Sequence, residues 1–140
     1  MAMLAIGRLS KDSGVKIPTI RYYESIGLLP PPVRSEGNRR MYPPEAVRRL
    51  RFIRHARELG FEIDAIRRLA DIAQDPGQPC CEADLLARRR LVEIEEKISR
   101  LAAQRDELVR MIGECTHGRV EDCGVIDTLD DHAKCLHAKH

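Results

Sequence analysis

The sequence predicts a mainly α-helical protein: a winged helix-turn-helix, then a long coiled-coil helix, then a short C-terminal loop. Three observations carry this prediction. Two short helical stretches meet at Gly14 with the spacing of a helix-turn-helix. Residues 82–112 contain neither Pro nor Gly and repeat apolar positions at helical spacing. Two cysteines, Cys115 and Cys123, then flank His117 in a stretch of small and polar residues.

The composition suits this architecture. The chain has 140 residues and is 43% hydrophobic, with only two Phe and no Trp, which favours helices packed through Leu, Ile and Ala. No apolar run approaches the roughly 20 residues that span a bilayer, and the first residues lack the pattern of a secretory signal. We therefore expect a cytoplasmic protein without membrane contact, whose five cysteines are reduced thiols.

The charge is distributed unevenly along the chain. Residues 1–60 carry 12 Lys and Arg against 5 Asp and Glu, a net charge of +7, whereas residues 61–140 carry 12 against 17, a net charge of −5. A basic N-terminal half suggests a polyanionic partner, and nucleic acid is the default candidate. The alternative is a chance clustering of solvated arginines.

The first two helices are defined by their glycines. The stretch LAIGRLSKDSGV predicts a short helix with Ile6, Leu9 and Val15 facing inward and Gly14 as its C-terminal stop. The stretch KIPTIRYYESIGLL predicts a second helix that ends at Gly27. The short turn between them gives the helix-turn-helix.

A hairpin and two more helices follow. The stretch VRSEGNRRMY has β-favouring residues at both ends and a turn at 36–38, so it predicts the wing. A third helix begins after Pro43 and Pro44 and stops at Gly60, and a fourth ends at residues 75–77. Their inward positions are Val47, Leu50, Ile53 and Leu59 in the third helix, and Ile63, Ile66, Leu69 and Ile72 in the fourth.

A winged helix-turn-helix reads DNA with one helix and grips phosphate with its wing. The guanidinium of Arg21 can donate to guanine or to phosphate, and tyrosines can contact sugar and phosphate. The DNA-binding candidates are Thr19, Arg21, Tyr22 and Tyr23 in the second helix, and Arg34, Asn38, Arg39 and Arg40 in the wing. We also expect one of the two tyrosines to pack in the core, and Met41 and Tyr42 to anchor the wing.

The long helix predicts dimerisation. A helix over 82–113 is about 48 Å long, and its apolar positions alternate three and four residues apart, with Arg105 in one apolar slot. These positions are Leu91, Ile94, Ile98, Leu101, Leu108 and Ile112. Because the N-terminal domain is too small to cover such a seam, we expect a homodimer through a parallel or an antiparallel coiled coil.

The four stretches AIGRLSKDSGV, TIRYYESIGLL, RSEGNRRMY and LRFIRHARELGFEIDAIRRL, in this order, resemble the MerR family of bacterial transcription regulators. The resemblance implies a DNA-binding domain (1–75), a dimerisation helix (80–114) and a metal-binding loop with a tail (115–140). It further implies binding to promoter DNA whose two elements are misphased, which the effector-loaded dimer untwists for RNA polymerase. By position, Arg21, Tyr22 and Arg39 match DNA-contacting residues of the family.

The cysteines predict a metal site. Cys115 and Cys123 bring two thiolates within reach of one soft or borderline ion. Cys81 stands one helix length away, so it cannot reach this loop within one chain. In an antiparallel dimer, the start of one helix lies beside the end of the other, and Cys81 of one subunit then faces the loop of its partner. This argument favours the antiparallel arrangement.

The resemblance also reduces the number of candidate metal ions. The copper- and gold-sensing branch has Ser at the position of Cys81, whereas this chain has Cys and so resembles the branch that senses divalent metals. His117 resembles a ligand of zinc-sensing members, but Thr116 stands where those members have a second cysteine, a role that Cys80 could take. The tail adds His132, Cys135, His137 and His140 as further ligands, or else it is a disordered end. We therefore expect Zn(II) first, then Cd(II) or Pb(II), and then Hg(II).

Other readings of the sequence remain. An enzyme is not expected, because no Ser/His/Asp set, carboxylate pair or Gly-rich phosphate loop is present. A thiol-redox regulator would join Cys115 and Cys123 in a disulfide, and a relative with a structural zinc would sense something else. An iron–sulfur sensor of this family needs four clustered cysteines near the loop, where this chain has two.

Overall fold

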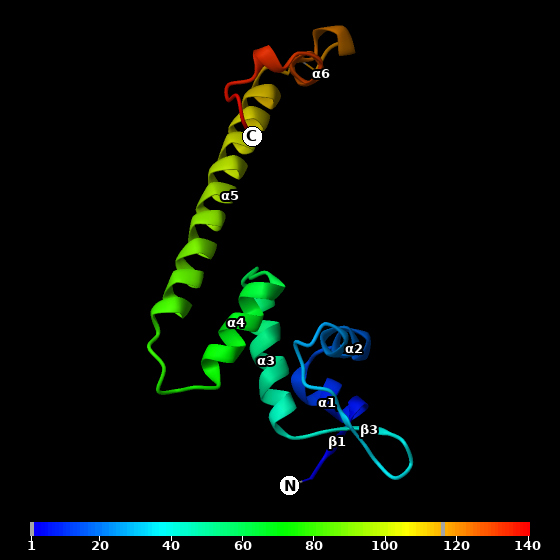
Figure 1. Ribbon diagram of the computed structural model, residues 1–140. Helices are drawn as coiled ribbons and strands as arrows, with labels where there is room; N and C mark the ends of the chain where they lie inside the picture. Colours follow the sequence, from blue (N-terminus) through cyan, green and yellow to red (C-terminus); the bar gives the residue numbers. More distant parts are fainter. Residues whose placement is uncertain (1, 116) are drawn as a thin grey trace. The chain divides into compact units, whose positions relative to one another are not determined.

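The computed structural model describes residues 2–115 and 117–140, and it divides into two compact units, residues 1–86 and 87–140. Each unit is described by itself below (Figure 1). Among the described residues, no helix combines the length and the apolar character that a membrane crossing requires.

The first unit begins with the expected helix-turn-helix. Helix α1 (Ile6–Ser13) ends at Gly14, whose φ of +74° lies in the left-handed region that glycine tolerates best. The Ser10 hydroxyl donates to the Val15 carbonyl at 2.7 Å and holds the turn. Helix α2 (Ile17–Ser25) starts with Pro18 in its first turn, where the missing N–H leaves no bond unmade.

A small antiparallel sheet forms the wing. Strands β2 (Val33–Arg34) and β3 (Arg40–Tyr42) make the predicted hairpin, and Asn38 takes the left-handed conformation in its turn, with φ +59°. A third strand, β1 (Leu4–Ala5), pairs with the other edge of β3, so the order is β1-β3-β2. The sequence predicted a helix from Leu4 onward, whereas the helix begins at Ile6 because the two preceding residues pair with Tyr42 and Met41.

Helices α3 (Glu45–Glu58) and α4 (Ile63–Ala73) complete the core of this unit. Leu9, Ile20, Leu50, Ile53 and Ile66 are fully buried. The expectation for Leu59 was wrong, since its side chain is 53% exposed. The chain turns at Gly60 directly after α3, so Ala56 takes the inward place and Phe61 packs against the core instead.

Arginines of α3 and α4 clamp the ends of the first two helices. The last carbonyls of a helix lack partners within it and carry its negative dipole end, so cations are favoured there. Side chains donate to carbonyls at these helix ends from three positions: Arg51 to Asp12 (2.8 Å), Arg54 to Ser13 (3.5 Å) and Arg67 to Ile26 (2.7 Å). A fourth arginine, Arg49, donates to the Leu28 carbonyl in the loop after α2 at 2.8 Å. Part of the basic surplus of residues 1–60 is therefore structural.

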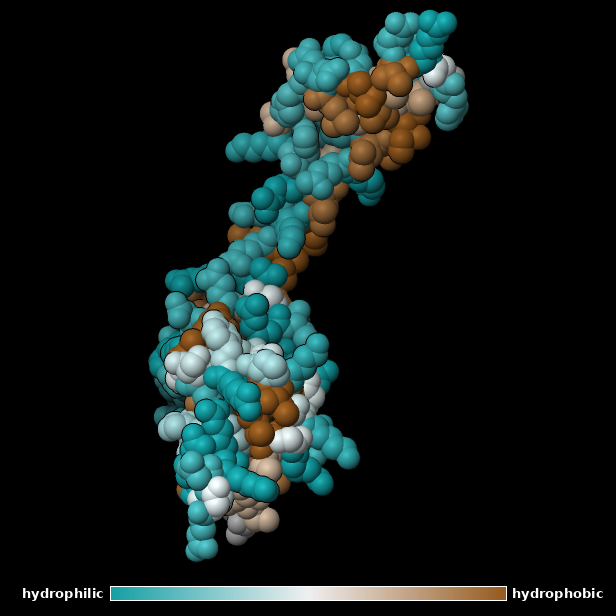
Figure 2. Space-filling view, turned by 90° about the vertical axis from the view of Figure 1, so that its right-hand side faces the viewer, coloured by the Kyte–Doolittle hydropathy of each residue, from teal (hydrophilic) through white to brown (hydrophobic). Residues whose placement is uncertain are grey.

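Helix α5 (Cys81–Gly113) is a single uninterrupted helix of 33 residues. Its predicted apolar seam is largely solvent-exposed in the single chain, and Figure 2 shows hydrophobic residues running along it. The exposed members are Leu91, Ile98, Leu101, Leu108 and Ile112. An apolar stripe of this kind marks an interaction surface.

The second unit ends in short elements packed on the last turns of α5. A 3-10 turn η1 (Val120–Asp122) leads into α6 (Gly124–Asp130), and a second turn η2 (His132–Lys134) follows. Thr128 of α6 and Met111 of α5 are buried between these elements. A side-chain carbon on Gly124 would lie 3.2 Å from Cβ of Glu114, so the start of α6 sits close against the residue before Cys115.

Candidate functional site

The second helix presents one face to solvent. Arg21 is exposed and Tyr22 is 54% exposed, whereas Tyr23 is 8% exposed and belongs to the core. Thr19 is half-buried beside them. The two tyrosines thus divide between surface and core as expected, and of the pair only Tyr22 offers its ring and hydroxyl to a ligand.

The wing is anchored to α2 through one carboxylate. Glu24 accepts a short hydrogen bond from the Tyr42 hydroxyl and pairs with Arg40 at 3.2 Å. Tyr42 is buried, so it holds the wing as predicted, and Arg40, a predicted phosphate ligand, is engaged with Glu24.

The tip of the wing carries the other polar candidates. Arg34 donates to the carbonyl of the exposed Asn38 at 3.1 Å, which closes the hairpin. Within the described residues, the side chains of Arg21 and Arg39 make no ion pair, and both are exposed. These two cations are therefore free to contact a phosphate or a base.

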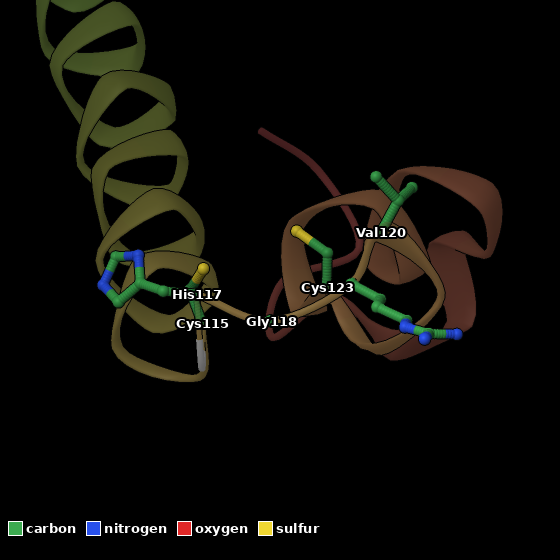
Figure 3. Close-up of a pocket in the computed structure, with 6 residues that line it drawn as sticks. Cys115, His117, Gly118, Val120 and Cys123 are labelled. Carbon is green, nitrogen blue, oxygen red and sulfur yellow. The ribbon is translucent and has the colours of Figure 1, made fainter.

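The two loop cysteines line one small pocket of about 110 Å³ together with residues 117–120 (Figure 3). Cys115 follows the end of α5, and its N–H still donates to the Ile112 carbonyl at 3.1 Å. Cys123 is the residue immediately before α6. Both thiols are half-buried and unoxidised. The ends of two helices thus hold the thiols on the two sides of the loop.

The surroundings of Cys123 favour its thiolate. The backbone N–H groups of Ile126 and Val125, at the open N-terminus of α6, lower the pKa of the Cys123 thiol. Partial burial works in the opposite direction, and the neighbouring Cys115 thiol lowers the pKa of Cys123 further. A thiolate beside a second thiol, in a pocket of this size, is a fitting donor pair for a soft or borderline metal ion.

The remaining predicted ligands of this site lie apart from the thiol pair. His117 borders the pocket with a left-handed backbone, φ +57°, but its ring points away from Cys123 (Figure 3). Cys80 and Cys81 are exposed at the start of α5. Thr116, the residue after Cys115 in the sequence, lies outside the described residues. The structure thus brings two of the predicted ligands together.

The C-terminal tail forms a second cluster of metal-binding side chains. Ligand atoms of His132, Cys135 and His140 lie within 4.8 Å of one another. The centroids of the two imidazole rings are 5.2 Å apart. His137, also predicted as a ligand, is elsewhere: its Nε2 lies 3.3 Å from a carboxylate oxygen of Asp106. Through His137 the tail contacts Asp106 and Glu107 of α5.

A buried ion pair in this unit was not anticipated. Glu107 is 2% exposed, pairs with Arg110 at 3.3 Å and accepts the N–H of His137 at 2.7 Å. Burial raises the pKa of Glu107, but these bonds, with one from the Leu136 N–H, outweigh it and lower the pKa. The heptad pattern gave no signal for this pair, because it places Glu107 off the apolar seam.

Comparison with known proteins identifies a family whose models match most of the chain. Residues 4–71 match the family model described as MerR HTH family regulatory protein, and residues 47–111 match the one described as MerR, DNA binding. The chain is 38% identical over 135 residues to the HTH-type transcriptional regulator ZntR of Escherichia coli K12, covering 94% of this chain and 95% of that protein.

Two further relatives are named or crystallised with metals. The mercuric resistance operon regulatory protein of Serratia marcescens is 39% identical over 116 residues, which cover 83% of this chain and 78% of that protein. The transcription regulator PbrR691 of Ralstonia metallidurans CH34, solved in complex with lead(II), is 35% identical with a TM-score of 0.79 and covers 91% of this chain and 99% of that one. These relatives are regulators, in agreement with the expectation that the chain is not an enzyme.

Proposed function

The chain belongs to the MerR family of transcription regulators, within its metal-sensing branch, and from this premise we propose that it activates transcription on binding Zn(II). Cd(II) or Pb(II) are the next candidates for the ion. The observation that carries the proposal is the pair of adjoining thiols, Cys115 and Cys123, mounted between the ends of α5 and α6.

Double-stranded promoter DNA is the partner of the first unit. Arg21 and Tyr22 stand on the exposed face of α2, where a recognition helix meets the major groove. Arg39 in the wing is placed for a phosphate, with Arg34 and Asn38 beside it. Of the other candidates, Tyr23 and Arg40 act from within the domain, by supporting the helix and the wing.

The exposed seam of α5 supports a homodimer. Side chains such as Ile98 and Leu101 are more than half exposed in the single chain, and a second copy of the helix would bury them. An antiparallel pair sets the start of each helix beside the end of the other. The chain regions would then act as a DNA-binding domain (1–75), a dimerisation helix (80–114) and a metal-binding end (115–140).

The metal site is completed across the dimer. Because a helix of 33 residues is about 50 Å long, Cys81 and the loop of the same chain belong to opposite ends of α5. Cys81 of the partner subunit supplies the third thiolate beside Cys115 and Cys123. Metal binding then favours one dimer geometry over another, and the dimer passes this preference to the DNA as a twist that aligns the promoter for RNA polymerase.

The ion is assigned from the donors. Zn(II) takes four ligands in a tetrahedron from thiolates and imidazoles, and His117, at the rim of the pocket, can turn in as the fourth. Cd(II), Pb(II) and Hg(II) accept three thiolates alone, and the regulator crystallised with lead(II) is similar to this chain over most of its length. Cys80, adjacent to Cys81, remains available to a second ion.

We further assign the tail cluster an accessory role. His132, Cys135 and His140 supply two imidazoles and one thiolate, a donor set suited to Zn(II) with one open position. Zinc stoichiometry measured on the reduced protein tests this role. Replacing Cys135 by Ser should remove zinc from the tail and leave the zinc at the loop, and an unchanged stoichiometry would refute it.

The decisive experiment for the sensor is a titration of the reduced dimer with competing metals, scored by transcription from its promoter. Zn(II) should raise transcription above the metal-free level, and Cys81→Ser should abolish this response while the DNA affinity stays the same. Cys80→Ser is the matched control, since it changes the neighbouring thiol. If no divalent ion activates transcription, the sensor proposal is wrong, and if Cys81→Ser responds fully, the third ligand is misassigned.

A thiol-redox regulator is the second candidate. The shared pocket of Cys115 and Cys123 and the lowered pKa of Cys123 favour it, because a thiolate near a second thiol is readily oxidised to a disulfide. Counting free thiols separates the two functions. A metal sensor loses reactive thiols when zinc is added without oxidant, whereas a redox sensor loses them only with oxidant.

A further inference from the structure

One buried carboxylate stands out in the second unit. Glu107 lies on α5 with its side chain 3% exposed, although its neighbours Leu108 and Val109 are more than half exposed. Burying a carboxylate is unfavourable unless hydrogen bonds and a counter-charge replace the lost water. Here the tail supplies the N–H of His137 at 2.7 Å, and Arg110 supplies the counter-charge at 3.3 Å.

Arg110 also contacts the residues on both sides of the cysteine loop. Its guanidinium donates to the Thr128 hydroxyl of α6 at 3.2 Å and to a carboxylate oxygen of Glu114 at 3.0 Å. Its side chain is only 18% exposed, and its Nε is buried without a partner among the described residues. One arginine therefore joins the last turns of α5, the helix α6 and the residue that precedes Cys115.

These contacts fix the two sulfur-bearing residues relative to each other. Cys115 directly follows Glu114, and Cys123 directly precedes Gly124, the first residue of α6. Gly124 approaches Glu114 so closely that an added Cβ would lie 3.2 Å away. The packing of α6 on α5 therefore bears directly on the spacing of the two sulfurs.

We propose that Glu107 and Arg110 are positioning residues that set the spacing of the Cys115 and Cys123 sulfurs and thereby the choice of metal ion. This inference rests on the proposed function, in which these two thiolates bind the ion. Zn(II) forms short bonds to sulfur, of about 2.3 Å. If α6 packs less tightly on α5, the distance between the two sulfurs increases. This increase lowers the affinity for a small ion more than for a larger ion, because the larger ion forms longer bonds to sulfur.

The test compares Zn(II) and Cd(II) on the reduced full-length protein, with a competing chelator for affinity and the cadmium–thiolate absorption for the site. Glu107→Gln should lower Zn(II) affinity by about tenfold, the effect usual for a residue that orients a ligand, and should lower Cd(II) affinity clearly less. Thr128→Val removes one of the bonds that hold α6 without changing any charge, and it should shift the ratio in the same direction. Glu96→Gln, an exposed change on the same helix, is the control.

The outcomes separate three cases. A Zn(II)-to-Cd(II) affinity ratio that falls in both variants, with unchanged circular dichroism and unchanged apo DNA binding, supports the inference. An unchanged ratio, or an equal loss for both ions, overturns it, because a general weakening of the fold does not discriminate between ions. If Cys115→Ser leaves the cadmium–thiolate band intact, the loop is not the metal site, and the proposed function fails together with the inference.

Discussion

Truncating one residue of the α5 seam should weaken the dimer by a predictable amount. Ile98 is 59% exposed in the single chain, and replacing it with Ala removes three of its four side-chain carbons. At about 0.8 kcal/mol for each buried carbon, the share still to be buried amounts to about 1.4 kcal/mol in each subunit. A symmetric dimer loses this contribution twice, so its dissociation constant should rise about 100-fold.

Sedimentation over a dilution series of the metal-free protein measures this constant. Glu96→Ala is the matched control, because residue 96 lies on the opposite face of the same turn and is already exposed. A change of less than threefold for Ile98→Ala, or an equal change for both variants, would refute the assignment of this stripe as the dimer interface. A wild-type protein that stays monomeric at every concentration would do the same.

Three further outcomes are expected. Gly14→Ala should lower the free energy of unfolding by about 1–2 kcal/mol, because the residue has φ +74° and the new Cβ would meet the guanidinium of Arg54. Gly7→Ala, where the new Cβ enters open space, should raise the free energy of unfolding by about 0.5–1 kcal/mol. Urea denaturation measures both changes. Alkylation of Cys123, followed by mass spectrometry, should set in at lower pH in the folded than in the unfolded protein. Its depressed pKa stabilises the fold above the unfolded pKa, and this contribution is lost as the pH falls through the folded pKa. Arg39→Ala should weaken binding to all DNA sequences and reduce the salt dependence of log K by about 0.9 for each subunit, or about 1.8 for the dimer, and Arg100→Ala in α5 should not.

The long, periodic parts of this fold are predictable from the sequence. Helix α5 begins at Cys81, one residue before the predicted start, and the hairpin turn falls at Asn38, because periodicity and turn residues are local signals. Strand β1 was missed since two residues, Leu4 and Ala5, cannot display a repeat. It exists only because the edge of β3 offers hydrogen bonds.

The candidate sites are predictable only in part, because the sequence shows local spacing but not the contacts between distant segments. The spacing of Cys115 and Cys123 predicted the thiol pair, but their place in one pocket depends on how α6 packs on α5. The arginines of α3 suggested nucleic acid, yet Arg51 and Arg54 instead bond to the carbonyls that end α1. Glu107 resembles any solvated glutamate in the sequence, and only the returning tail makes it a buried one.

The pairing of Leu4 with Tyr42 bears on how this protein can be handled in the laboratory. A purification tag or fluorescent fusion placed ahead of residue 4 emerges beside the hairpin that we propose contacts DNA, and a polyhistidine tag at the other end would compete for added ions with the metal site proposed in the tail. The exposed turn at residues 75–79 is no safer a place for an inserted label, because it directly precedes Cys80 and Cys81, and Cys81 is proposed to complete the metal site of the partner subunit.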